Sequence, residues 1–159
     1  MNSNRNFDLK IYKRLQSLTK SNSRRDDENK INLVDHKLEK IEFKLPEGFK
    51  EKDDPLDFSY DKVNMRFTLE SEEIFKKYTK DQQADPMNKM LKNYTIGENE
   101  EVKIITYRTI SAVMNIFNFI FFKKVSDFSV FGIFTCPNSS SEKWTPVFEE
   151  VISSLKAVV

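Results

Sequence analysis

Cys136 and His36 are the residues best suited to covalent or metal chemistry, and each is the single residue of its type in the sequence. A cysteine nucleophile needs a general base within hydrogen-bond reach, and a zinc site needs several ligands at workable spacing. The two residues stand 100 positions apart, Cys136 beside an apolar run and His36 among charged neighbours. We therefore interpret Cys136 as a small buried hydrophobe and His36 as a solvated side chain. No metal site, cofactor or Cys–His dyad is predicted.

Other motifs with a chemically suggestive spacing are also explained without catalysis. Ser-x-x-Lys, the spacing of serine acyl-enzymes, occurs at 17–20 and 140–143 without the companion motifs of those enzymes. Adjacent acids occur at several places, but a glycosidase pair must flank a cleft, which sequence neighbours do not show. The three glycines stand too far apart for a phosphate-binding loop. We predict no catalytic residue and no enzyme, and we keep a hydrolase with an unrecognised site as an alternative.

The overall charge does not indicate a polyanionic partner. Twenty-six basic and twenty-five acidic residues leave a net charge of +1. The best nucleic-acid candidate is the set of basic residues around Tyr12 in the first 25 positions, which could track phosphates while the ring stacks on a base. The acidic run at 26–28 opposes this. Nucleic-acid binding is therefore not predicted.

The single cysteine and the apolar run at 110–122 bear on location. One cysteine cannot form an internal disulfide, and the start of the sequence lacks the apolar core of a signal peptide, so we expect a reducing, cytoplasmic setting. Thirteen residues as a helix would span about 20 Å, less than the hydrocarbon core of about 30 Å. No membrane span is predicted.

Composition divides the chain into a polar arm at 1–40 and one domain at 41–159. The arm has too few apolar groups to offset the entropy of ordering it, so we expect it to be weakly ordered, although 31–34 leaves open the start of a strand or turn. In the domain, alternating apolar residues or runs of β-branched and aromatic residues predict five strands, at 41–45, 62–69, 101–110, 113–122 and 127–135. The strand at 113–122 is apolar on both faces, which indicates a central strand covered on both sides.

Three helices are predicted. Ser71 followed by two glutamates is a plausible helix start, and Asp85-Pro86 indicates a second short helix that ends at Gly97. The closing helix, which begins between 139 and 146, carries one continuous apolar stripe. The stripe consists of Trp144, Val147, Phe148, Val151, Ile152, Leu155 and Val158. This stripe must pack on the phenylalanine-rich sheet.

The run FGIFTCPNSSSEKWTPVFEEVISSL at 131–155 resembles the C-terminal signature of the Mog1/PsbP-like superfamily. A last apolar strand with a Gly-x-Phe ending is followed by a polar turn and a helix with Trp144, Pro146 and Phe148 at the signature positions. FKLPEGF at 43–49 is similar to the early strand and turn of that superfamily. The resemblance covers 41–159. It implies an α+β fold in which an antiparallel β-sheet is flanked by helices on both faces, an α/β/α sandwich.

The resemblance also implies a bias towards binding other proteins. Our first hypothesis is a non-enzymatic protein-binding module of the adaptor, chaperone or immunity type, with another protein as partner and a homodimer left open. Three aromatic residues near the early turns, Phe49, Phe58 and Tyr60, are candidate contacts if they are exposed, and packing at the sheet edge is their alternative role. The second hypothesis is a small-ligand or lipid binder with a pocket between the sheet and a helix.

Overall fold

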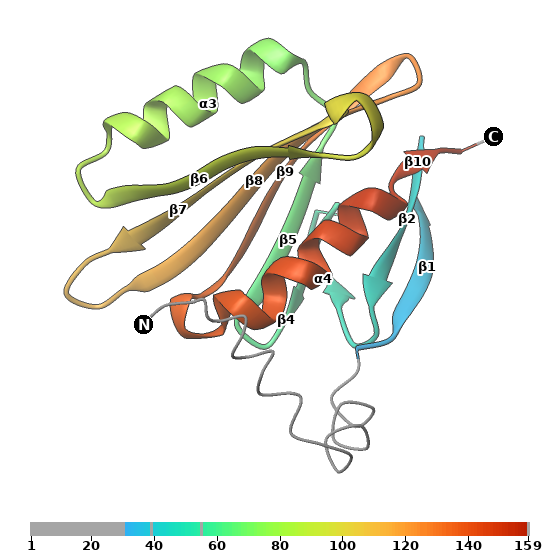
Figure 1. Cartoon of the computed structure of the whole chain (residues 1–159). Coiled ribbons are helices and arrows are strands. Elements are labelled where there is room, and N and C mark those ends of the chain that lie inside the picture. The colour runs from blue at the N-terminus through green and yellow to red at the C-terminus, as the bar shows by residue number, and fades with distance from the viewer. Residues whose placement is uncertain (1–30, 39, 55, 159) are drawn as a thin grey trace, which may run out of the picture. The chain divides into compact units, whose positions relative to one another are not determined.

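The computed structural model describes residues 31–158 except 39 and 55 (Figure 1). From Leu33 onward the chain forms one compact unit. Its strands are β1 (Leu33–Leu38), β2 (Ile41–Pro46), β3 (Lys50–Glu51), β4 (Asp57–Tyr60), β5 (Val63–Thr68), β6 (Asn88–Ile96), β7 (Val102–Ile110), β8 (Asn115–Val125), β9 (Phe128–Pro137) and β10 (Lys156–Ala157). Its α-helices are α3 (Glu72–Ala84) and α4 (Ser141–Ser154), with short 3₁₀ turns at Glu98–Glu100 and Asn138–Ser140.

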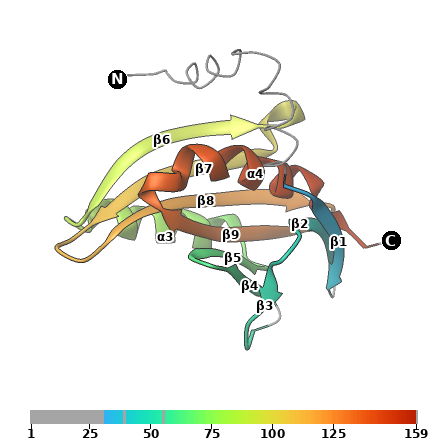
Figure 2. The same cartoon turned by 90° about the horizontal axis from the view of Figure 1, so that it is seen from below.

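The strands form two antiparallel sheets. The larger sheet has seven strands in the order β3-β4-β5-β9-β8-β7-β6, and the smaller has three in the order β1-β2-β10. Strands β6, β7, β8 and β9 are the long strands of the larger sheet, whereas β5 and β4 are short (Figure 2). The five predicted strands are confirmed as β2, β5, β7, β8 and β9. A single sheet was expected, and the small second sheet is an addition to it.

Helices α3 and α4 lie on opposite faces of the large sheet (Figure 1). The alternation of side chains on β8 shows this directly, because Phe122 packs on Phe75 of α3 whereas Phe119 packs on Phe148 of α4. Strand β8 is buried on both faces over most of its length. The predicted α+β fold, an antiparallel sheet flanked by helices on both faces, is therefore confirmed, as is the covered central strand.

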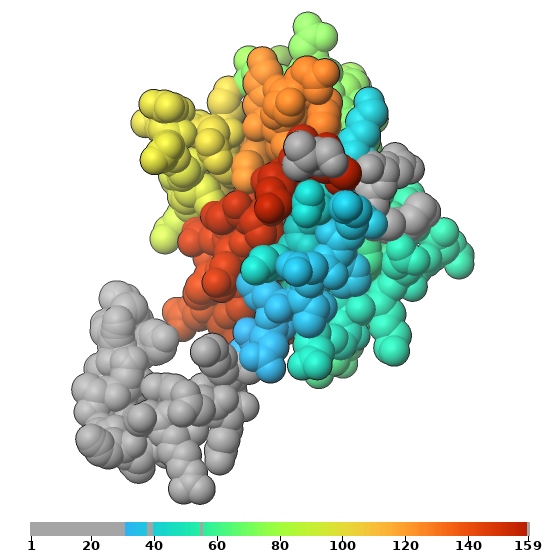
Figure 3. Space-filling view, turned by 90° about the vertical axis from the view of Figure 1, so that its right-hand side faces the viewer, coloured from blue at the N-terminus to red at the C-terminus, as the bar shows by residue number. Residues whose placement is uncertain are grey.

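The face under α4 holds the larger part of the aromatic core. The ring of Phe148 meets those of Phe134 and Phe119, with centroid distances of 5.2 and 5.3 Å, and Phe134 in turn meets Phe121 at 5.2 Å. The small sheet lies beside α4 and contributes Phe43, whose ring centroid is 4.6 Å from that of Phe67 on β5 (Figure 3). The predicted packing of the C-terminal stripe on the sheet is confirmed, since Trp144, Phe148, Val151, Ile152 and Leu155 are all buried.

The folded unit begins before residue 41, so the predicted arm was drawn too long. Residues 33–38 form β1, which pairs with β2 from Leu33 opposite Pro46 to Leu38 opposite Ile41. His36 is half-buried rather than solvated, because its ring stacks on Phe43 at 5.9 Å. The expectations for residues 1–30, including weak order and the basic set around Tyr12, lie outside the described residues.

The helix predicted at 85–97 is wrong, because this segment is strand β6. Asp85 ends α3, and residues 88–96 pair with β7 at every position except Leu91. The register shifts between Met90 and Lys92, where a β-bulge leaves Leu91 without a cross-strand partner. The bulge breaks the alternation of side chains that would otherwise have indicated a strand. The apolar residues of β6 therefore stand at spacings that resemble those of a helix.

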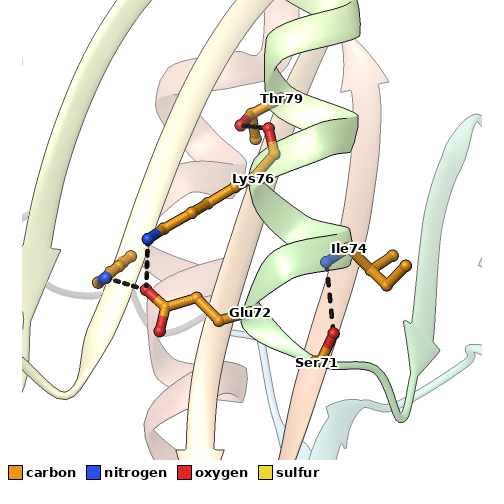
Figure 4. Close-up of polar contacts among 6 residues, drawn as sticks. Ser71, Glu72, Ile74, Lys76 and Thr79 are labelled. Atoms are coloured by element: carbon orange, nitrogen blue, oxygen red, sulfur yellow. Dashed lines mark hydrogen bonds and ion pairs between the residues drawn. The ribbon is translucent and has the colours of Figure 1, made fainter.

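The start of α3 agrees with the prediction (Figure 4). The Ser71 hydroxyl accepts a hydrogen bond from the Ile74 amide at 3.4 Å, which satisfies one free N–H of the first turn. Glu72 forms ion pairs with Lys76 on the next turn and with Lys103 on β7. The hydrogen bond from Lys103 is the main reason that the pKa of Glu72 lies below its ordinary value. The ion pair with Lys103 fixes the start of α3 on the sheet.

Lys123 joins β8 to the end of α4 through a buried ammonium group. Its Nζ donates to the carbonyl oxygens of Ile152 and Leu155, both at 2.9 Å, at the end of the helix where carbonyls lack the amide of a following turn. The Ile152 carbonyl also accepts from the Leu155 amide at 3.1 Å. The side chain is buried, and Glu101 lies 3.9 Å from Nζ. Burial lowers the pKa of Lys123, and the charge of Glu101 opposes this shift.

We expect the Lys123→Met variant to lose about 1.5–3 kcal/mol of unfolding free energy at pH 7, the usual value of hydrogen bonds to a charged group. Because the pKa of Lys123 is lowered in the folded state, wild-type stability relative to this variant should rise with pH between that pKa and the ordinary value of 10.5. Urea unfolding of both proteins across this range measures the difference. The exposed neighbour Lys124 provides the control, and an equal loss in Lys124→Met would contradict the assignment.

Candidate functional site

The three candidate contact residues do not share one environment. Phe58 is fully buried on β4, and Phe49 is 7% exposed between Tyr60 and Trp144. The expectation that they are exposed is therefore wrong for both, because the small sheet and α4 pack over this edge of the large sheet. Tyr60 is 49% exposed, with its ring 5.6 Å from that of Phe49. Only Tyr60 remains available as a contact.

Exposed apolar side chains concentrate instead at one end of the large sheet. Eight large apolar residues of the described part are exposed, and four of them lie at the turn between β7 and β8 or at the adjoining start of β6. We call these four the hairpin-tip patch: Met87, Ile110, Val113 and Met114. Val113 is 90% exposed, the highest value of the eight. Figure 1 shows this end of β7 and β8 projecting beyond α4.

Backbone hydrogen bonds hold the patch together. The Ile110 amide donates to the Met87 carbonyl at 2.9 Å, which ties the end of β7 to the segment before β6. The Ser111 amide donates to the Met114 carbonyl at 2.9 Å, and the Val113 amide donates to the Ser111 hydroxyl at 3.3 Å. The loop therefore holds Val113 and Met114 outward in a hydrogen-bonded turn.

Sequence analysis missed this patch because it placed Val113 and Met114 in a strand. The structure starts β8 at Asn115, so residues 111–114 form the loop. One signal was present in the sequence. A two-residue hairpin turn of Ser-Ala lacks the glycine, asparagine or aspartate that such turns require. The missing turn residues indicate that the loop is longer than two residues, which places Val113 and Met114 at its tip.

A polar network beneath the patch positions β6 against β7 and α3. Asn88 donates to the carbonyl and side-chain oxygens of Gln82 at 3.0 and 3.1 Å, and accepts from the Thr109 hydroxyl at 2.6 Å. Buried Asn118 donates to the same hydroxyl at 3.0 Å, and Tyr107 donates to Gln82 at 3.2 Å. Burial raises the pKa of Tyr107, so its hydroxyl stays protonated as a donor. The network gives the tip a rigid base.

The groups that could support catalysis are poorly placed for it. Cys136 is buried, as predicted, and burial raises the pKa of its thiol to about 11, so the thiolate is scarce at neutral pH. His36 lies on the small sheet and Cys136 on the large one. Within residues 31–158, as far as the structure describes them, no three His, Cys, Asp or Glu side chains are grouped to hold a metal ion. In the same range, no helix is long and apolar enough to cross a membrane.

Comparison with known proteins identifies the fold. No protein-family model matches the chain, and no curated protein sequence does. The solved structure of the Ran-binding protein Mog1p of Saccharomyces cerevisiae matches with a TM-score of 0.54 and 8% identity, over 79% of this chain and 95% of Mog1p. The PsbP protein of the cyanobacterium Synechocystis matches with a TM-score of 0.56 and 11% identity, over 80% of this chain and 92% of that protein. The chain has the Mog1/PsbP-like fold.

Proposed function

We propose that this chain, with its Mog1/PsbP-like fold, is a non-enzymatic protein-binding module that contacts its partner through the hairpin-tip patch. The observation that carries the proposal is the gathering of four of the eight exposed large apolar side chains at one end of the sheet. Scattered apolar residues are normal on a protein surface, whereas a group of them marks an interaction site. The patch projects from a hydrogen-bonded turn, so little order need be gained on binding.

Two further observations support this function over the alternatives. Mog1p, which shares the fold, is a Ran-binding protein, so the fold can serve protein recognition. Phenylalanine rings fill the space between α4 and the large sheet, where a small ligand or lipid would have to lie. We propose a cytoplasmic setting for the module, because its single cysteine cannot form an internal disulfide. An adaptor, chaperone or immunity role would each use such a surface.

The test is site-specific photocrosslinking in cells of the source organism, with the full chain carrying a photoreactive phenylalanine at Val113. We expect one dominant protein adduct, identified by mass spectrometry of the crosslinked peptide. The double variant Val113→Ser and Met114→Ser should weaken binding of the identified partner by at least about tenfold, since buried apolar anchors dominate interface energies. Its stability should change little, because both side chains are exposed.

A matched position on α3 provides the control. Lys77 is exposed and lies outside the patch, so crosslinker there should not yield the same adduct. Identical adducts from Lys77 and Val113 would refute the patch as the contact surface. An adduct between two copies would identify a homodimer as the partner. The same measurement at Tyr60 decides whether that ring extends the contact.

A further inference from the structure

The β-bulge in β6 places two lysines on the same face of the sheet. Side chains alternate along a regular strand, so residues three apart, such as Lys89 and Lys92, would point to opposite faces. The bulge between Met90 and Lys92 removes this difference, since Lys89 lies opposite Arg108 and Lys92 lies opposite Thr106. Arg108 and Thr106 are two residues apart on β7 and share a face. The Lys92 amide donates to the Thr106 hydroxyl at 3.1 Å, which stabilises the bulge.

The three cations, Lys89, Lys92 and Arg108, form what we call the cationic strip. It lies on the α4 face, because Phe117 and Phe119, opposite Arg108 and Thr106 on β8, belong to that face. Ile110 of the hairpin-tip patch follows Arg108 by two residues and lies on the same face. The strip therefore continues from the patch up β6 and β7 for about 13 Å, the length of four strand residues.

The strip has unbalanced positive charge. Lys89 and Arg108 are direct cross-strand neighbours, and like charges in such positions repel. Six ion pairs join lysines or arginines to acids within the described residues, and none of them involves the three strip cations. Arg108 donates to the Asn115 side chain at 2.9 Å, which orients its guanidinium group. Glu149 of α4 keeps its negative charge, but it accepts from the Tyr94 hydroxyl at 2.6 Å, two residues beyond Lys92 on β6 and therefore past the end of the strip that is far from the tip.

We propose that the hairpin-tip patch and the cationic strip together bind a protein segment that carries apolar anchors at one end and carboxylates at the other. This inference rests on the proposed function and names the chemistry of the partner. Carboxylates would relieve the repulsion between Lys89 and Arg108, and the apolar anchors would cover the patch. The bulge has a role in this arrangement, because it brings Lys89 and Lys92 to the same face. Bulges commonly redirect side chains at functional sites.

The one-sided geometry favours a protein segment over a membrane surface. If the tip entered a bilayer, lipid headgroups would surround it, and we would expect cations on both of its faces. Here the three strip cations lie on the α4 face, whereas directly beneath the tip the α3 face carries the neutral network of Gln82, Asn88 and Thr109. Asp85, also beside the tip, accepts from the Met87 amide at 2.9 Å. The cationic strip leads away from the hairpin-tip patch along the strands, and this linear arrangement fits an elongated segment of a partner protein.

The test uses three short synthetic peptides that share one apolar half and differ only in a second half rich in Glu, Ser or Lys. In titrations of the full chain followed by NMR, the Glu peptide should bind about tenfold more tightly than the Ser peptide and shift amide signals of 87–92 and 106–114. The preference should fall as salt is added. The double variant Lys89→Glu and Lys92→Glu should prefer the Lys peptide, whereas Lys77→Glu and Lys80→Glu on α3 should leave the preference unchanged.

Several results would overturn the proposal. Equal affinity for the three peptides, no binding of the Glu peptide up to about 1 mM, or unchanged preference in the Lys89→Glu and Lys92→Glu variant would each do so. Tighter binding to vesicles of phosphatidylcholine and phosphatidylglycerol than to the Glu peptide would assign the surface to membranes. A crosslink from Val113 to a partner segment without acids would refute this inference and leave the proposed function intact. Loss of both the Val113 adduct and peptide binding would refute both.

Discussion

The Phe134→Ala variant is expected to lose about 3–5 kcal/mol of unfolding free energy, the usual cost of removing a fully buried phenylalanine ring. Phe134 on β9 has no exposed surface and stands at the centre of the α4-face core. Its ring centroid lies 5.2 Å from those of Phe121 and Phe148 and 5.3 Å from that of Phe67. Truncation would leave a cavity that these rings, anchored on three different elements, cannot close together.

Urea denaturation with a two-state fit measures this loss. The same substitution at Phe128, which is half-buried at the start of β9, is the matched control and should cost less than half as much. Domains have unfolding free energies of about 5–15 kcal/mol, so Phe134→Ala should leave a marginally folded protein. Equal losses at the two positions would show that the core does not depend on the ring cluster.

The Gly132→Ala variant is expected to be destabilised by about 3 kcal/mol, near the upper end of the range for overpacked cores. Gly132 lies opposite Phe121 on β8 and opposite Phe67 on β5. A Cβ at this position would stand 2.0 Å from Cε1 of Phe121, far inside van der Waals contact. Either the ring or strand β9 must shift, and both are held by the strands on each side.

A double-mutant cycle with Phe121→Ala tests this cause. Once the ring is removed, the alanine at 132 meets no obstacle from it, and alanine is then preferred to glycine inside a strand by about 0.5–1 kcal/mol. We therefore expect Gly132→Ala to be harmful in wild type and neutral or stabilising in the Phe121→Ala background. A similar loss in both backgrounds would rule out the contact with Phe121 as the reason for glycine.

These two positions give a physical meaning to the Gly-x-Phe ending noticed in the sequence. Both residues point to the α4 face, because they are two apart on β9. Glycine makes room for the ring of Phe121, and phenylalanine fills the centre of the core that α4 covers. The motif is therefore a packing device, and its presence in the Mog1/PsbP-like fold carries no information about a partner.

The spacing of apolar residues in the sequence predicted the strands and helices whose buried faces follow a regular period. The strand at 115–125 is apolar on both sides because helices cover both, and the stripe from Trp144 to Leu155 keeps helical spacing because it lies on one sheet. Ser71 marks a helix start because a hydroxyl cap acts within one turn. In each case the signal and the structure that it specifies lie within the same few residues.

Other features of the fold depend on strand pairing between distant parts of the chain and leave no pattern in the local sequence. Strand β6 resembles a helix in sequence because its bulge disturbs the alternation, and only pairing with β7 selects the strand. The burial of Phe58 depends on a small sheet that joins residues 33–46 to 156–157, over a hundred positions later in the chain. The candidate site follows the same rule. Sequence determined that 110–114 is apolar, but the fold alone exposed these residues and set three cations beside them, because neighbours across a sheet are chosen by strand register.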